Sequence, residues 1–128
     1  MKFAQTRSIT IAAPPSAVIE VIGDGNRLPE WAPAFARSAR ADEECWLIDT
    51  GGAEVRIRLK TSVESGTVDI LSAEDERIGV FGRVIPNTKG SEFLFTLLFE
   101  EGTDQVAIDA QMKTVEEELE TVRTLSET

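Results

Sequence analysis

The chain of 128 residues has 23 acidic residues against 13 basic ones, a formal net charge of −10, and 41% hydrophobic residues. This length and apolar content predict one domain, over residues 1–128, with a core of its own. The acidic balance would repel phosphate backbones and anionic lipid surfaces, so it argues against nucleic acid as a partner. The chain contains no histidine and no tyrosine. The usual general base near neutral pH and the histidine-based metal and nucleophile sites are therefore excluded.

The single cysteine and the amino-terminal segment indicate in which compartment the protein is found and which cofactors it can bind. Cys45 is the only cysteine, which excludes an internal disulfide and a thiolate zinc site. The opening "MKFAQTRSIT" lacks the apolar stretch of a signal peptide, and no apolar run approaches the ~18 residues that span a bilayer. We therefore expect a cytoplasmic protein without membrane insertion, and neither a metal ion nor another cofactor.

The first third of the chain predicts a strand followed by two short helices. Residues 8–13, "SITIAA", alternate apolar and polar side chains as a half-buried strand does, and two prolines then end it. Pro15 suits the first turn of a helix over residues 16–22, whose apolar side chains recur at i, i+3 and i+4. A second helical turn ends at Trp31, before Pro33 returns the chain to extended geometry.

The middle of the chain predicts an antiparallel meander. Short apolar runs alternate there with Gly, Pro and acidic turn signals, which is typical of strands joined by tight turns. The expected strands are residues 35–40, 45–50, 53–60, 66–72, 77–86 and 91–100.

From Thr103 to the end, the apolar period becomes that of one long amphipathic helix. Its apolar face is formed by Ile108, Met112, Val115, Leu119 and Val122. Glu116, Glu117, Glu118 and Glu120 are expected to form a solvated acidic face on the other side. The order of elements predicts an α+β fold, in which a curved antiparallel sheet of about seven strands wraps around this helix.

The sequence also resembles a known superfamily over nearly its whole length. The segments that carry the resemblance are "ITIAAPPSAVIEVIGDGNRLPEWAP", "GTVDI", "GRVIPNTKGSEFLFTL" and "EEELETVRTLSE". They resemble the START-like, helix-grip superfamily (SRPBCC), which includes polyketide cyclases/dehydrases and the birch-pollen allergen proteins. The resemblance implies a hollow between the curved sheet and the long helix, closed by the two short helices. Such a hollow is the usual form of a site for a small hydrophobic molecule.

Four apolar or aromatic residues are candidates for the wall of this hollow. Trp31 is either a gate or wall whose indole N–H serves a ligand oxygen, or a core residue that fixes the short-helix corner on the sheet. Phe81 and Phe95 are expected to contact the ligand. Met112 is either part of the core or a flexible ligand contact.

Asp69 and Arg83 are ionisable residues within otherwise apolar strands, where burial is costly unless the group is paired or used. Together they could serve as acid and electrostatic clamp on a substrate. An even-numbered turn between their strands would place them on opposite faces of the sheet, whereas an odd-numbered turn or a bulge would reunite them. The alternatives are a structural ion pair and two exposed charges.

The strand over residues 91–100 is apolar on both faces, with Phe93, Phe95, Leu97 and Phe99 on one and Leu94 and Leu98 on the other. Both faces are therefore expected to be covered. One face is covered by the long helix and lines the hollow. The other is covered by a second subunit, as in a homodimer, or belongs to a central strand of a strongly coiled sheet.

Three functions remain open at this point. The leading prediction is a protein that binds a small apolar or amphipathic molecule, lipid- or polyketide-like, without evident catalysis. The second is a cyclase/dehydratase-type enzyme with Asp69, or another carboxylate of the cavity, as base and Arg83 and the Trp31 indole as donors. The third is a protein-interaction module that uses a sheet face or the acidic helix.

Overall fold

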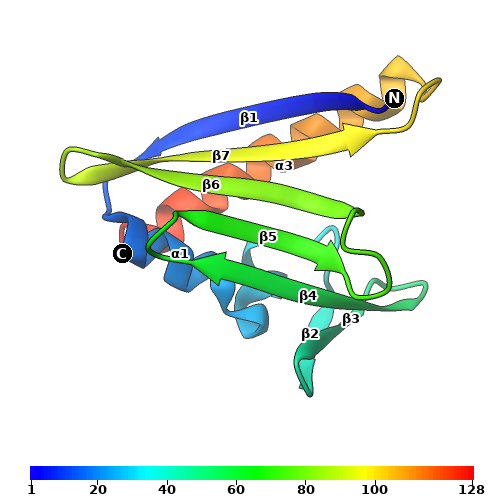
Figure 1. Cartoon of the computed structure of the whole chain (residues 1–128), viewed down its shortest axis with the longest axis horizontal. Helices are drawn as coiled ribbons and strands as arrows, with labels where there is room; N and C mark the ends of the chain where they lie inside the picture. The colour runs from blue at the N-terminus through cyan, green and yellow to red at the C-terminus, as the bar shows by residue number, and fades with distance from the viewer.

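The computed structural model describes all 128 residues as one seven-stranded antiparallel sheet with three helices against it (Figure 1). In chain order the elements are β1 (Phe3–Ile11), α1 (Pro15–Gly23), α2 (Leu28–Trp31), β2 (Ser38–Asp42), β3 (Cys45–Asp49), β4 (Glu54–Ser62), β5 (Thr67–Ser72), β6 (Gly79–Asn87), β7 (Gly90–Phe99) and α3 (Gln105–Ser126). The order of strands across the sheet is β1-β7-β6-β5-β4-β3-β2. This arrangement confirms the predicted α+β helix-grip fold with two short helices after the first strand.

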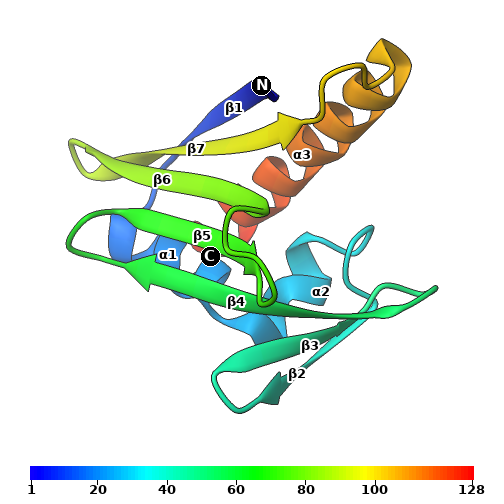
Figure 2. The ribbon, with the colours of Figure 1, turned by 45° about the vertical axis from the view of Figure 1, so that its right-hand side comes forward.

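The three helices do not cover the sheet evenly. The long helix α3 packs chiefly against β1, β7, α1 and α2, and it runs behind β1 and β7 in Figure 1. Figure 2 shows α3 diverging from β3 and β4, with α2 lying near β2 and β3 instead. The sheet face that points to the helices, called the inner face below, is therefore not covered by α3 over β4 to β6.

Local sequence signals explain where the helices begin. Pro15 occupies the first turn of α1, where its missing N–H is not needed. The Asp24 carboxylate accepts a hydrogen bond from the Asn26 backbone N–H at 3.0 Å, which starts the short turn before α2. Asp104 caps α3 in the same way, accepting a hydrogen bond from the Val106 N–H at 3.3 Å.

Aromatic packing fixes α2 on the inner face of the sheet. The Trp31 and Phe95 rings lie edge to face, with centroids 6.1 Å apart, and Phe93 and Phe95 are 5.3 Å apart. Gly82 on β6 leaves room for these rings. A Cβ atom at position 82 would lie 2.6 Å from the Val68 carbonyl oxygen and 3.2 Å from the Phe95 ring.

The predicted alternation of β7 is confirmed. Its side chains Phe93, Phe95 and Leu97 are buried on the inner face, whereas Leu94 is only partly buried and Leu98 is exposed on the opposite, outer face. The apolar face of α3 is also as predicted, with the five expected residues buried against the core.

The bounds of β1 and β2 differ most from the sequence prediction. β1 begins at Phe3 rather than at residue 8, because it pairs with β7 along its whole length, from Phe3 opposite Phe99 to Ile11 opposite Ser91. Pairing of this kind uses backbone hydrogen bonds and does not require alternating apolar side chains, so it leaves no apolar period in the sequence. β2 covers Ser38–Asp42 rather than residues 35–40, because the chain is still turning up to Ala36.

Candidate ligand cavity

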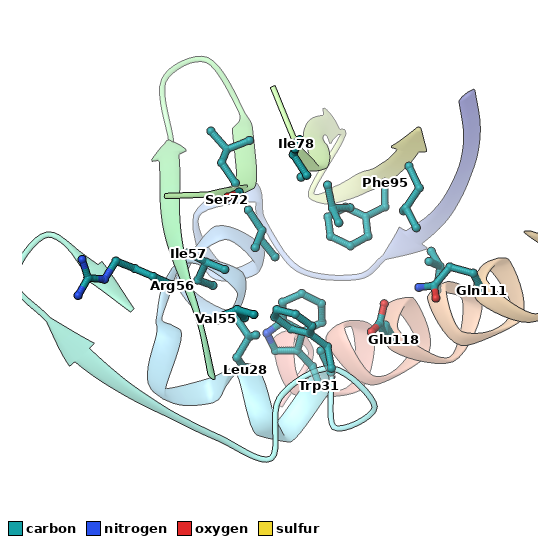
Figure 3. Close-up of a pocket in the computed structure, with 18 residues that line it drawn as sticks. Leu28, Trp31, Val55, Arg56, Ile57, Ser72, Ile78, Phe95, Gln111 and Glu118 are labelled. Carbon is teal, nitrogen blue, oxygen red and sulfur yellow. The ribbon is translucent and has the colours of Figure 1, made fainter. Parts of the chain in front are cut away.

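An apolar cavity of about 340 Å³ lies between the inner face of the sheet and the helices α2 and α3 (Figure 3). Thirteen of its 18 lining residues are hydrophobic. They are Leu28, Trp31, Ala32, Phe35, Val55, Ile57, Ile70, Leu71, Ile78, Val80, Phe95, Leu97 and Val115. Two other hollows of the surface have only two hydrophobic lining residues each, so this cavity is the most apolar of the three. Its size falls in the lower part of the ~300–1,000 Å³ range of small-molecule sites.

The mouth of the cavity is apolar. Phe35, Val55 and Ile78 line it while remaining 36%, 37% and 53% exposed, so they lie where it opens to solvent. Exposed apolar side chains at the rim of a cavity favour the binding of an apolar ligand, because the ligand covers apolar surface that otherwise contacts water. Trp31, only 2% exposed, forms a wall of the cavity rather than its mouth.

Trp31 brings one unsatisfied polar group to this wall. Its indole Nε1 is buried and has no hydrogen-bond partner in the protein. A buried donor without a partner costs about 1–3 kcal/mol. A ligand oxygen that accepts this hydrogen bond would recover that cost.

Glu118 brings the second polar group, from α3. Its carboxylate projects from the helix toward the cavity beneath Phe95 (Figure 3). The side chain is only partly exposed, and burial raises its pKa from 4.5 to about 7, with the neighbouring charge of Glu117 adding to the effect. Near neutral pH the carboxyl group is therefore present in both its protonated and its ionised form.

The other polar lining residues are occupied elsewhere or uncharged. The Arg56 guanidinium points away from the cavity in Figure 3, and its Nη2 lies 2.7 Å from Asp42 Oδ2. The Ser72 hydroxyl oxygen accepts a hydrogen bond from the Glu74 N–H at 3.3 Å. Glu118 is thus the only acidic residue of the lining, and no unpaired cation lines the cavity with it.

The residues proposed from sequence divide between this cavity and other places. Trp31 and Phe95 both line the cavity and contact one another. Met112 does not line it. Its side chain, 1% exposed, packs in the core on the neighbouring face of α3, so of the two alternatives the structure supports the core residue.

Asp69, Arg83 and Phe81 do not reach the cavity, and the expectation that they do is wrong. Asp69 lies opposite Phe81 in the β5–β6 ladder, while the neighbours of Asp69 in β5, Val68 and Ile70, are buried on the inner face. The three residues therefore share the outer face.

Register explains this outcome. The turn between Ser72 and Ile78 contains five residues, an odd number, so Asp69 and Arg83 lie on the same face of the sheet, as expected for such a turn. That face is the outer one, away from the cavity. There, Asp69 Oδ1 accepts a hydrogen bond from the Gly82 N–H at 3.3 Å, and Arg83 Nε donates one to the Ser65 carbonyl at 3.1 Å. Both groups are bound to backbone, without forming an ion pair, and neither can serve a ligand in the cavity.

Glu118 is the residue that the sequence analysis missed, because its place in a run of three acidic residues, Glu116 to Glu118, predicts solvent exposure. The signal that could have found it is its spacing from the apolar face of the helix. Gln111, Val115 and Glu118 recur at i, i+4 and i+7, which forms a second stripe that shares Val115 with the core stripe. That second stripe lines the cavity.

No group of three or more Asp, Glu or Cys side chains is arranged to hold a metal ion. None of the helices combines the length and apolar character that crossing a bilayer requires.

Comparison with known families fits this architecture. Residues 2–127 match the family described as polyketide cyclase / dehydrase and lipid transport. The chain belongs to this family. No functionally curated protein matches this polyketide cyclase / dehydrase family member in sequence.

Solved structures share the fold of this family member at low sequence identity. Zhui aromatase/cyclase from Streptomyces sp. R1128 has a TM-score of 0.69 at 15% identity, covering 99% of this chain and 94% of its own. Ara h 8.0201 has a TM-score of 0.67 at 16% identity, covering 98% of each chain. The Aha1 dimer from Colwellia psychrerythraea has a TM-score of 0.73 at 12% identity, covering 98% of this chain and 96% of its own. At these identities the likeness establishes the common helix-grip fold.

Proposed function

We propose that the protein binds a small apolar or amphipathic molecule, lipid- or polyketide-like, in the cavity between sheet and helix. The observation that carries this proposal is a cavity of about 340 Å³ with mainly apolar walls and an apolar mouth. The unpartnered Trp31 indole N–H supports it, because a ligand acceptor would satisfy this donor. The family description, which names both cyclases/dehydrases and lipid transport, is consistent with it.

The size of the cavity favours a compact ligand over a long extended chain. 2-Methylnaphthalene is a suitable first probe, because it carries no polar group and tests the apolar walls alone. We expect its binding to the purified protein to be measurable by isothermal titration calorimetry. We also expect native mass spectrometry of freshly purified protein to show a co-purifying small molecule.

A matched pair of variants on β6 connects binding to this cavity. Val80 lines the cavity, so Val80→Phe should fill it and weaken 2-methylnaphthalene binding at least about tenfold, the equivalent of about 1.4 kcal/mol. Ile85 lies on the same strand but on the outer face, and Ile85→Phe should leave binding unchanged. Equal binding by both variants would place the ligand elsewhere and refute the proposal, as would no binding to the unmodified protein.

A second candidate function is proton transfer on a bound carbonyl compound, as in a cyclase/dehydratase-type enzyme. The observation that favours it is the Glu118 carboxyl group, because a pKa of about 7 suits a general acid–base near neutral pH. Glu118 takes the role that the sequence analysis gave to Asp69, which lies outside the cavity.

The test of this second function is deuterium exchange at the carbon next to the carbonyl group of 1-tetralone, followed by NMR in D₂O. The wild-type protein should accelerate the exchange over buffer, Glu118→Gln should abolish the acceleration, and Glu117→Gln should retain it. Acceleration that survives in Glu118→Gln would eliminate Glu118 as the base.

A further inference from the structure

The cavity contains one carboxyl group and no cation to balance it. Each element that faces Glu118 presents uncharged side chains, apart from Arg56 of β4, whose guanidinium turns outward to Asp42. The helix α2 presents Trp31, while β5, β6 and β7 present apolar residues and Ser72. On α3 itself, the charge that acts on Glu118 is another carboxylate, Glu117. The cavity therefore carries negative or zero charge, but never positive charge.

This charge distribution discriminates between head groups of a ligand. A ligand carboxylate would have to leave water for an apolar cavity without a cationic partner. It would also be repelled by Glu118 whenever that side chain is ionised. The overall charge of −10 opposes the approach of an anion as well. A neutral hydroxyl group has no such penalty. It donates a hydrogen bond to the ionised carboxylate, and it donates to or accepts from the protonated form.

We propose that Glu118 is the polar anchor of the cavity and selects ligands with a neutral hydroxyl head, phenols or alcohols, against ligands that end in a carboxylate. This inference rests on the proposed binding function and adds the chemical class of the ligand to it. It excludes free fatty acids as the preferred occupant of the cavity.

The Trp31 indole adds a second requirement at a different point of the wall. In Figure 3 its nitrogen lies on the side of the ring near Leu28 and Val55, away from Glu118. One oxygen atom of a ligand therefore cannot be expected to serve both groups. A ligand that satisfies the cavity carries a hydroxyl group toward Glu118 and a separate acceptor oxygen toward Trp31.

Three probes with the same apolar body test the selection. They are 2-naphthol, 2-naphthoate and 2-methylnaphthalene, titrated by calorimetry into the full-length protein at pH 6 and pH 8. At pH 8 we expect 2-naphthol to bind at least about tenfold more tightly than 2-naphthoate. Because Glu118 is mostly protonated at pH 6, 2-naphthoate should bind about tenfold more tightly there than at pH 8. The affinity of 2-methylnaphthalene should stay the same at both values.

Glu118→Gln removes the charge while keeping the shape of the side chain. It should raise the affinity for 2-naphthoate at pH 8 about tenfold, remove its dependence on pH, and change 2-methylnaphthalene binding by less than about threefold. Glu117→Gln, on the exposed side of the helix, should retain most of the discrimination because burial is the larger cause of the Glu118 pKa. The comparison of pH 6 with pH 8 in the wild-type protein needs no variant and so does not depend on how the variants fold.

The outcomes separate this inference from the proposed function. If all three probes bind with similar affinity at pH 8, the cavity binds small molecules but Glu118 does not select among them, and the inference is overturned alone. A Glu118→Gln protein that still discriminates against 2-naphthoate overturns it as well. If no probe binds, including 2-methylnaphthalene, the proposed function fails and the inference fails with it.

Discussion

Replacing Glu118 with glutamine should stabilise the protein at pH 8 and change its stability only slightly at pH 5. Burial, with Glu117 beside it, raises the pKa of Glu118 from 4.5 to about 7 in the folded state. The folded chain therefore holds this proton more tightly than the unfolded chain does. The contribution of Glu118 to stability falls as the pH rises from about 4.5 to about 7, and its full cost is present above that range.

The magnitude follows from the same pKa. At about 1.4 kcal/mol for each tenfold change in proton affinity, a pKa raised from 4.5 to about 7 corresponds to at most about 3–4 kcal/mol. Because Glu118 keeps part of its surface in water, solvent screening lowers this cost. We expect Glu118→Gln to gain about 1–3 kcal/mol over the wild type at pH 8, and less than about 1 kcal/mol at pH 5.

Urea denaturation at pH 5, 6, 7 and 8 measures this effect as the difference in unfolding free energy between variant and wild type at each pH. Glu117→Gln, the matched control, should give a smaller gain because neighbouring charge is the lesser of the two causes. A difference between Glu118→Gln and wild type that stays constant from pH 5 to pH 8 would refute the reasoning. It would mean that the carboxyl group is fully hydrated in the folded protein.

Four further predictions concern the wall, the sheet, the core and the assembly. Trp31→Phe removes the unpartnered N–H, so 2-acetonaphthone, which offers a carbonyl acceptor, should bind about fivefold more weakly in calorimetry, while 2-methylnaphthalene changes less. Gly82→Ala should cost about 1–3 kcal/mol in urea denaturation because its Cβ meets the Val68 carbonyl, whereas Gly52→Ala, which meets open space, should change stability by less than about 0.5 kcal/mol. Met112→Ala should cost about 2–5 kcal/mol as a core truncation and leave 2-methylnaphthalene affinity unchanged; a specific loss of affinity would restore Met112 as a ligand contact. Light scattering tests the homodimer, one of the two alternatives for the outer face of β7: a mass twice the chain's 14.0 kDa supports it, and a mass of one chain refutes it.

Local patterns were sufficient to predict most of the fold. The prolines at the start of α1, the alternation of β7 and the apolar stripe of α3 each depend on one element and its nearest neighbours. Each is therefore visible in the sequence as a proline or as a hydrophobic period. The edge strand β1 was placed short because its first half is held by backbone pairing with β7, which requires no particular side chains.

The cavity was harder to predict because it depends on how distant elements are placed. Whether Asp69 and Arg83 share a face of the sheet depends on the length of one turn, and a change of a single residue in that turn reverses the answer. Glu118 belongs to the same acidic run as the exposed Glu117, and the position of α2 beside α3 makes its environment apolar. Trp31 could be predicted because the prolines around it fix the corner from which it packs.

The pairing of β1 with β7 also has a consequence for synthesis of the chain. The first strand finds its only sheet neighbour about ninety residues later in the sequence, at the last strand before the terminal helix. A nascent chain leaving the ribosome therefore carries β1 unpaired until β7 has emerged. Contacts of such long sequence separation slow folding, since a large loop must close before they form. Closure of the sheet at β1 is thus expected only after β7 has been synthesised, and the exposed strand in the interval is a natural point of contact for chaperones.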